Sequence, residues 1–340
     1  MDQVNRKDLA DPHFQSQAYQ LWMKHGGLLA VRGKDLEVVT PKELLAWSKV
    51  FGTVEEEIPA SREDKMVPGF PILRIGNIKD PDTGQPMAQF TVVPPLVNER
   101  DMVYNPQTRR PVWHTDSTYR QNPPIGSVFQ CRQAPACGGG ATLFADMSRA
   151  FAKLDDAKKQ HLQRLEAICS LAHHDRKIHS YSPEYPILSP EQRLANPPNR
   201  VPVVLEHPVT RTPALYGLNS STCVIVPKGK IVSNQDMDLW DLEGIEDDSV
   251  RIWRDMLPDV TLPDLTVRFQ WQPGDIVVWD NRCTLHAPTG FDHERCTREM
   301  WRLTILDNRN EDNKVVASYL HEHNSVSLRC ERTLCRLLQS

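Results

Sequence analysis

Several features that mark other classes of protein are missing from this chain of 340 residues. No apolar run approaches the roughly 20 residues that span a membrane. Residues 1–20 have no apolar core of a signal peptide. The net charge of −4 and the pI near 6.3 lack the basic excess of a nucleic-acid-binding protein. We therefore expect a cytoplasmic protein with neither a membrane nor a nucleic acid as partner.

Paired cysteine motifs are also missing. None of the eight cysteines belongs to a Cys-x-x-Cys pair, and they are scattered at positions 131, 137, 169, 223, 283, 296, 330 and 335. In a chain of this size without a secretion signal, this pattern predicts reduced thiols and no disulfide framework. The 27 prolines favour loops and strand edges over long helices.

The chain has no internal repeat, and its length suits one large core or two domains. We expect a single domain over residues 1–310. A stretch rich in Pro, Ser and charge, at about 170–265, predicts an insertion that holds one strand pair. Residues 311–340 form an extension whose Leu, Val and Tyr content suits a packed tail or a contact in a homo-oligomer.

The first motif with chemical content is Trp113-His114-Thr115-Asp116, which follows Val112. If this segment is a strand, His114 and Asp116 point to the same face and can converge on one metal ion. His-x-Asp triplets also arise by chance, and two other sets are candidates: His173 with Asp175, and His321 with His323. The first set lies in a polar run, residues 172–177, that predicts a loop or a helix end. The second lies near the C-terminus, where a solvated histidine pair is expected.

The second motif lies 172 residues after the first and ends at His286. Residues 268–280 predict a strand, a Pro-Gly-Asp turn and a second strand, hence a hairpin with His286 just beyond it. In residues 301–306, apolar and polar side chains alternate, which predicts the next antiparallel strand. Arg302 and Arg298 would then project from one face, the alternative being that both face solvent.

His-x-Asp with a distant histidine is the ligand set of the facial triad that holds Fe(II) and leaves its other positions open. An arginine beyond the second histidine supplies a fixed positive fork for the far carboxylate of a 2-oxo acid. The two motifs together therefore predict an iron oxygenase that uses a 2-oxo acid.

At this point the sequence resembles the taurine dioxygenase-like (TauD/TfdA) family of Fe(II)- and 2-oxoglutarate-dependent dioxygenases, which includes aryloxyalkanoate dioxygenases. The resemblance covers about residues 20–310. It rests on motifs that occur in the family's order: Trp113-His114-Thr115-Asp116, Gly139-Gly140-Ala141-Thr142-Leu143, His207-Pro208-Val209-Thr210-Arg211, Trp279-Asp280-Asn281-Arg282, His286, Arg298 and Arg302.

The resemblance implies a mainly β fold with flanking helices, a double-stranded β-helix (jelly-roll, cupin-like) core. It implies iron ligands at His114, Asp116 and His286. Thr142 and Arg298 would bind the far carboxylate of 2-oxoglutarate, and the substrate would meet Arg302 and Tyr119, with Arg110 as a further positive contact. Residues 108–111 and 219–223 differ from those of taurine-using members.

The function expected is oxidation of a small anionic substrate by O2 with Fe(II) and 2-oxoglutarate, releasing succinate and CO2. Hydroxylation, desaturation and cyclisation all remain open. An amino acid, sulfonate, phosphonate, aryloxy acid or natural-product intermediate suits the motifs better than taurine. Two other classes remain: a barrel enzyme, such as an isomerase or hydrolase, that uses another metal without a 2-oxo acid, and a non-catalytic binding module.

Overall fold

The computed structural model describes residues 1, 3–57, 60–90, 113–179, 185–217, 221–231 and 249–307. The strands are β1 (Leu28–Val31), β2 (Thr53–Val54), β3 (Leu73–Gly76), β4 (Gly126–Gln133), β5 (Thr142–Asp146), β6 (Leu165–Cys169), β7 (Asn199–Pro202), β8 (Val204–Glu206), β9 (Pro213–Leu215), β10 (Thr222–Pro227), β11 (Thr266–Phe269), β12 (Ile276–Asp280), β13 (Thr284–Pro288) and β14 (Glu299–Asp307). The α-helices are α1 (Pro12–Lys24), α2 (Pro41–Ser48), α3 (Met147–Lys153), α4 (Asp156–Leu162), α5 (Leu171–His179), α6 (Pro190–Ala195) and α8 (Ser249–Val260). Three short 3-10 helices are η1 (Arg6–Ala10), η2 (Leu36–Val38) and η3 (Ala60–Lys65).

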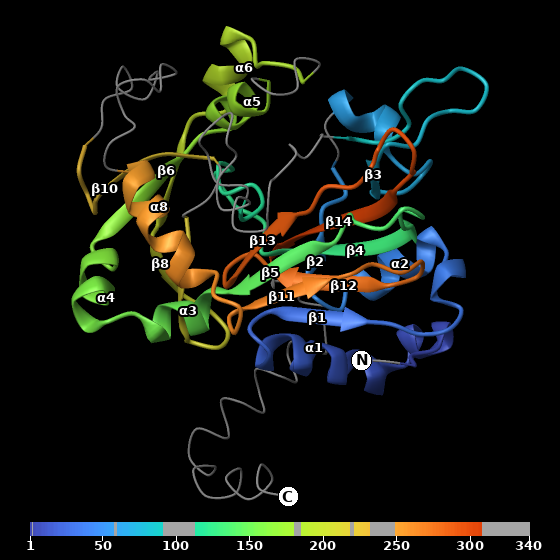
Figure 1. Cartoon of the computed structure of the whole chain (residues 1–340), viewed down its shortest axis with the longest axis horizontal. Helices are drawn as coiled ribbons and strands as arrows, with labels where there is room; N and C mark the ends of the chain where they lie inside the picture. The colour runs from blue at the N-terminus through green and yellow to red at the C-terminus, as the bar shows by residue number, and fades with distance from the viewer. Residues whose placement is uncertain are drawn as a thin grey trace, which may run out of the picture.

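Two antiparallel sheets form the core (Figure 1). The larger has the order β1-β12-β4-β14-β2, with β3 also paired to β14. The smaller has the order β11-β5-β13. The fold is therefore a jelly-roll with flanking helices, as the sequence predicted. A three-stranded sheet, β10-β6-β7, and the β8-β9 pair are added to this core.

Helices α1 and α2 cover the outer face of the larger sheet. Aromatic side chains dominate this contact: Trp22 and Trp47 both pack edge-on against Phe51. Every second residue of the sheet faces this layer, as Val128, Val278 and Leu303 show. A capping box opens α2, because the Thr40 hydroxyl accepts from Glu43 N and the Glu43 carboxylate accepts from Thr40 N.

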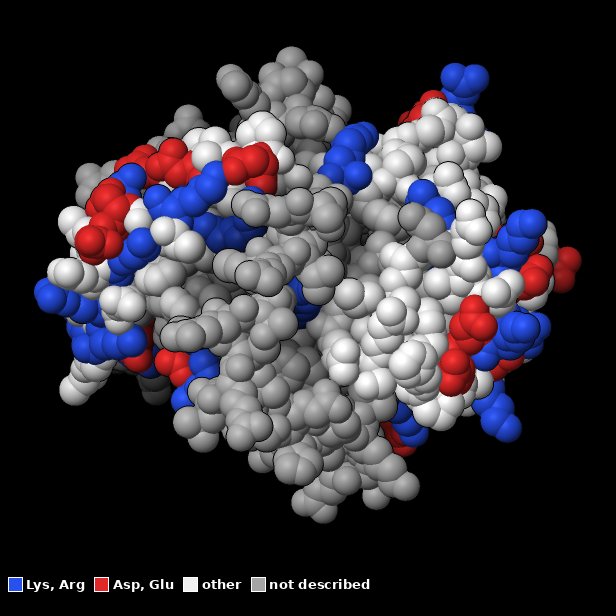
Figure 2. Space-filling view, turned by 90° about the horizontal axis from the view of Figure 1, so that it is seen from below, with Lys and Arg blue, Asp and Glu red and all other residues white. Residues whose placement is uncertain are grey.

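On the face of the molecule seen in Figure 2, the described Lys and Arg side chains are interspersed with Asp and Glu. Within the described ranges, none of the helices has the length and apolar character needed to cross a membrane. The extension expected at 311–340 lies outside the described residues.

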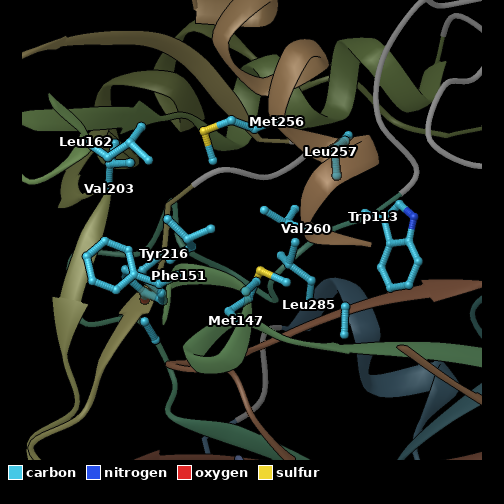
Figure 3. Close-up of a cluster of buried hydrophobic side chains, with 14 of the residues drawn as sticks. Trp113, Met147, Phe151, Leu162, Val203, Tyr216, Met256, Leu257, Val260 and Leu285 are labelled. Atoms are coloured by element: carbon cyan, nitrogen blue, oxygen red, sulfur yellow. The ribbon is translucent and has the colours of Figure 1, made fainter. Parts of the chain in front are cut away.

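The outer face of the smaller sheet packs on a second apolar layer (Figure 3). Leu143 and Ala145 of β5 and Leu285 of β13 point into it, toward Met147 and Phe151 of α3. This layer continues beneath α8 and the β10-β6-β7 sheet. It fixes which residues of β5 and β13 face the other way, into the space between the two sheets.

The alternation of side chains selects the residues that face this interior. Phe129, Cys131, Phe144, Trp279 and Met300 fill the space between the sheets. Residues two positions away on the same strands share that side, because side chains alternate. That rule adds Ser127 on β4, Thr142 on β5 and Arg302 on β14. His286 on β13 faces the same space because its neighbour Leu285 points into the outer layer.

Two local predictions were wrong. Residues 268–280 do not form a hairpin, because β11 pairs with β5 while β12 pairs with β1 and β4. The Pro-Gly-Asp turn instead carries the chain from one sheet to the other. His114 does not lie in a regular strand either; it forms an isolated antiparallel bridge to His286, and a turn begins at Asp116.

Candidate metal and 2-oxoglutarate site

The structure brings together the three residues expected to bind iron. One donor atom each from His114, Asp116 and His286 can be chosen so that all lie within 4.8 Å of one another. Asp116 Oδ1 is 3.8 Å from His114 Nε2 and 3.7 Å from His286 Nε2. Two imidazole nitrogens and one carboxylate oxygen converging on one point form the donor set of the facial triad.

The backbone holds the two histidines side by side. His114 N donates to His286 O at 2.9 Å, and His286 N donates to His114 O at 3.0 Å. Their rings lie 4.1 Å apart between centroids. Ser117 follows Asp116 with a φ of 54°, in the left-handed region that non-glycine residues rarely adopt. The chain therefore turns sharply away directly after the last ligand of the first motif.

The protonation states of the triad suit a divalent cation. Burial, reinforced by the neighbouring His114, lowers the pKa of His286 to about 3, so its ring is neutral near pH 7. Burial alone would raise the pKa of Asp116, but Arg302 and the two histidines outweigh burial and hold it below its usual range. A neutral imidazole and an ionised carboxylate are the forms that coordinate metals.

Arg298 has the features expected of a residue that binds a carboxylate. Its Nε is buried and has no hydrogen-bond partner among the described residues. Burial lowers the pKa of Arg298 to about 10, so it remains charged at neutral pH. Gly140 lies against it, and a Cβ at that glycine would come within 3.4 Å of Arg298 Cδ. A cation buried in this way, with no acid beside it among the described residues, favours an anionic ligand.

Thr142 is buried on β5, and its hydroxyl is oriented by a residue that sequence reasoning missed. Trp271 Nε1 donates to Thr142 Oγ1 at 2.9 Å. The indole can only donate, so the hydroxyl accepts from it and keeps its own proton for another acceptor. A carboxylate is such an acceptor. Trp271 follows β11, within the segment mistaken for a hairpin, so no local pattern linked it to Thr142.

Arg302 lies at the metal site, with Nη2 3.1 Å from Asp116 Oδ2. Asp116 therefore supplies a carboxylate partner for this guanidinium within the chain. Tyr119 is half-buried, and its ring lies 5.7 Å from that of His174 on α5. Arg110 lies outside the described residues.

A second buried cluster contains two motifs that carried the family resemblance. His207 Nε2 lies 3.0 Å from Asp280 Oδ2, and Arg282 donates to both oxygens of the same carboxylate. His207 Nδ1 accepts from the backbone N–H groups of Val209 and Thr210, so Nε2 carries the proton and donates to Asp280. Arg282 and His207 outweigh burial and hold the pKa of Asp280 below its usual range.

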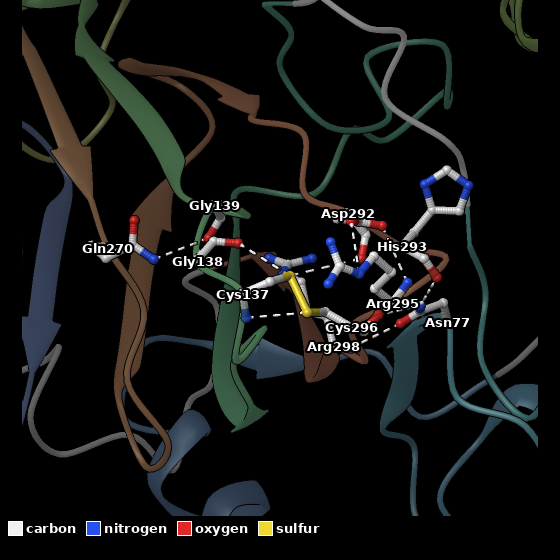
Figure 4. The surroundings of a disulfide bond; sticks show 10 residues. All are labelled: Asn77, Cys137, Gly138, Gly139, Gln270, Asp292, His293, Arg295, Cys296 and Arg298. Atoms are coloured by element: carbon white, nitrogen blue, oxygen red, sulfur yellow. Dashed lines mark hydrogen bonds and ion pairs between the residues drawn. A yellow bond between two sulfur atoms is a disulfide. The ribbon is translucent and has the colours of Figure 1, made fainter.

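Cys137 and Cys296 form a disulfide, so the expectation that all the cysteines are reduced thiols was wrong for this pair. Figure 4 shows the bond beside Arg298. It links the segment before β5 to the segment before β14. Asn77 ties the second segment from another side, since its Nδ2 donates to Cys296 O and its Oδ1 accepts from Arg298 N. The loop that carries Arg298 is therefore fixed from two directions.

The competing set that the structure describes, His173 with Asp175, does not form a metal site. His173 and Asp175 lie on α5, where residues two apart project in nearly opposite directions. His321 and His323 lie outside the described residues. Within the described ranges, the only groups with metal-ligand geometry are the triad and the His207, Asp280 and Cys283 cluster.

The sequence is similar to a family of known dioxygenases. The family "Taurine catabolism dioxygenase TauD, TfdA family" matches residues 2–304. An (S)-phenoxypropionate/alpha-ketoglutarate-dioxygenase of Delftia acidovorans is 29% identical over 281 residues, 82% of each chain. An alpha-ketoglutarate-dependent sulfonate dioxygenase of Saccharomyces cerevisiae is 28% identical, covering 64% of this chain and 48% of that protein.

Solved structures show the same fold. AAD-2, solved in complex with Mn(II) and N-oxalylglycine, aligns with a TM-score of 0.59 at 23% identity, over 86% of this chain and 87% of that one. A putative alpha-ketoglutarate dependent 2,4-D dioxygenase from Burkholderia xenovorans aligns with a TM-score of 0.58 at 22% identity, over 91% and 93%.

Proposed function

The chain belongs to the TauD/TfdA family of Fe(II)- and 2-oxoglutarate-dependent dioxygenases, and we propose that His114, Asp116 and His286 are its iron ligands. The observation that carries this proposal is the convergence of Asp116 Oδ1 on both Nε2 atoms, at 3.7 and 3.8 Å. Other metals would accept the same three ligands. Membership of this family, together with Arg298 and Thr142, favours the oxygenase over a barrel enzyme without a 2-oxo acid or a binding module.

Each residue then has a defined task. When bound, Fe(II) supplies the activation of O2 and the oxidation of a substrate C–H bond, while 2-oxoglutarate is converted to succinate and CO2. Arg298 holds the far carboxylate of 2-oxoglutarate by charge, and the Thr142 hydroxyl donates to it. The hydrogen bond from Trp271 orients the Thr142 hydroxyl toward this carboxylate. The apolar side chains between the sheets exclude water from the interior.

Charge balance supports an anionic substrate. The metal, Arg298 and Arg302 bring four positive charges, whereas Asp116 and 2-oxoglutarate bring three negative ones; His286 is neutral. One more anion neutralises the interior. Its relatives include dioxygenases named for a phenoxypropionate, a sulfonate and a sulfate ester. We therefore assign the chain a small carboxylate, sulfonate or sulfate-ester substrate that meets Arg302 and Tyr119.

A screen for substrate-stimulated succinate formation tests this proposal. The panel contains aryloxy acids, sulfonates, sulfate esters, phosphonates and amino acids, each beside a neutral analogue such as the amide. We expect stimulation by at least one acid and none by its neutral partner. Equal stimulation by the neutral partner contradicts the anionic-substrate assignment, and no dependence on added 2-oxoglutarate contradicts the proposed reaction.

A further inference from the structure

The two oxygens of the Asp116 carboxylate have different surroundings. Oδ1 faces His114 Nε2 and His286 Nε2, at 3.8 and 3.7 Å. Oδ2 faces away from them, accepting from Ser127 Oγ at 3.2 Å and lying 3.1 Å from Arg302 Nη2. We propose that Ser127 is a positioning residue, which with Arg302 holds Asp116 so that a single oxygen is offered to the metal.

The orientation matters because a carboxylate can bind a metal through one oxygen or through both. If Asp116 turned to offer both, Oδ2 would lose its two donors and leave the buried groups unpaired. Binding through one oxygen keeps three positions of a six-coordinate metal free for 2-oxoglutarate and O2. Groups that hold a metal ligand in place in this way commonly contribute about 10- to 100-fold to metal affinity.

Ser127 is well placed to act as a fixed support. It is completely buried on β4, the central neighbour of β12 and β14, and is in register with Trp279 on one side and Thr304 on the other. Backbone pairing on both sides keeps its Cα in place, and its alternation position directs the hydroxyl inward, toward Asp116. A regular strand of the larger sheet thus carries the support that the irregular segment 113–116 lacks.

A substitution at Ser127 changes the orientation of Asp116 without changing the charge of the site, whereas a substitution at Arg302 changes both. A guanidinium beside the site repels a divalent cation while it orients Asp116, so an Arg302 variant changes two opposing effects at once. The serine hydroxyl is neutral. Replacing it removes one hydrogen bond to Asp116 and leaves the charge of the site unchanged.

The test is the dissociation constant of Mn(II), measured by EPR of the free ion without 2-oxoglutarate or substrate. We expect Ser127→Ala to weaken Mn(II) binding by about tenfold and Ser127→Thr, which keeps the hydroxyl, to bind nearly as wild type. Ser48→Ala is the matched control: Ser48 is equally buried but donates to Leu44 O on α2. It should bind Mn(II) as wild type does.

Unchanged Mn(II) affinity in a folded Ser127→Ala variant overturns the proposal. If that variant does not fold, Ser127→Thr and Ser127→Val form a second pair of nearly equal shape, of which only Thr keeps the hydroxyl. Equal affinities of these two overturn the proposal, and weaker binding by Val supports it. This inference rests on the proposed metal site; failure of the wild type itself to bind Mn(II) contradicts that site instead.

Discussion

Two buried clusters in this protein contain the same three residue types, Asp, His and Arg, but they use them differently. Around Asp280, hydrogen-bonding capacity is largely used: both carboxylate oxygens accept from Arg282, one also accepts from His207, and both nitrogens of that histidine are paired. Such saturation is the mark of a structural network.

Around Asp116, the carboxylate and imidazole groups do not use all of their hydrogen-bonding capacity on one another. The distances from Oδ1 to the two Nε2 atoms, 3.8 and 3.7 Å, are too long for hydrogen bonds. His286 Nδ1 is buried and has no partner among the described residues. Proximity of candidate ligands therefore does not identify a metal site by itself. The distinguishing feature is donor atoms that face one point without satisfying one another.

The largest expected effect comes from removing a triad histidine. His114→Ala and His286→Ala should each lower 2-oxoglutarate turnover by well over a hundredfold, because losing a ligand costs more than losing a support for one. His173→Ala on α5 should leave turnover unchanged. Succinate formation measures all three variants. Full activity in either His114→Ala or His286→Ala would show that the Asp116 cluster is not the metal site, and the proposed difference between the two clusters would fail.

The next largest effect should come from the saturated cluster, as a loss of stability. Asp280→Asn leaves Arg282 buried without its counter-charge, and breaking a buried pair in this way costs about 3–5 kcal/mol. Urea unfolding of the metal-free protein measures the loss. A change below about 1 kcal/mol would show that this network is not the structural element described here.

The stability that the Asp280 network contributes should also depend on pH. Because the pKa of Asp280 is lowered in the folded protein, its contribution is present above the unfolded pKa of about 3.9 and is lost as pH falls below it. The stability difference between wild type and Asp280→Asn should therefore narrow below about pH 4. Urea midpoints at several pH values measure the difference; a gap that widens in acid contradicts the assignment.

Arg298 differs from the arginines of both clusters, because no acid lies beside it among the described residues. Arg298→Ala should raise the KM for 2-oxoglutarate by about tenfold or more, since a charge-assisted bond is worth about 1.5–3 kcal/mol. Mn(II) affinity should hardly change. An unaltered KM, or a parallel loss of Mn(II) binding, would remove Arg298 from the role assigned to it.

The smallest expected effect concerns Trp271, which touches Thr142 and not the co-substrate. Trp271→Phe removes one neutral hydrogen bond, worth about 0.5–1.5 kcal/mol, and should raise the KM for 2-oxoglutarate about two- to twelvefold. In a Thr142→Val background the same change should have almost no further effect. Full additivity of the two substitutions in a double-mutant cycle contradicts the proposed orienting role.

The sequence predicted most of the site because its motifs are local. His114-Thr115-Asp116 is read from one short segment, and Arg302 from the alternation of one strand. Ser127 and Trp271 escaped notice because their partners, Asp116 and Thr142, belong to other segments of the chain that meet them only in the folded protein. The false hairpin at 268–280 has the same origin: Pro-Gly-Asp marks a turn, but not which sheet each strand joins.

Anomalous scattering from crystals soaked in Mn(II) tests the central claim most directly, because both clusters are seen in one experiment. We predict one strong peak between His114, Asp116 and His286, and none at His207, Asp280 and Cys283. A peak at the second cluster, or none at the first, contradicts the conclusion that donor atoms which face one point without bonding one another mark the metal site of this protein.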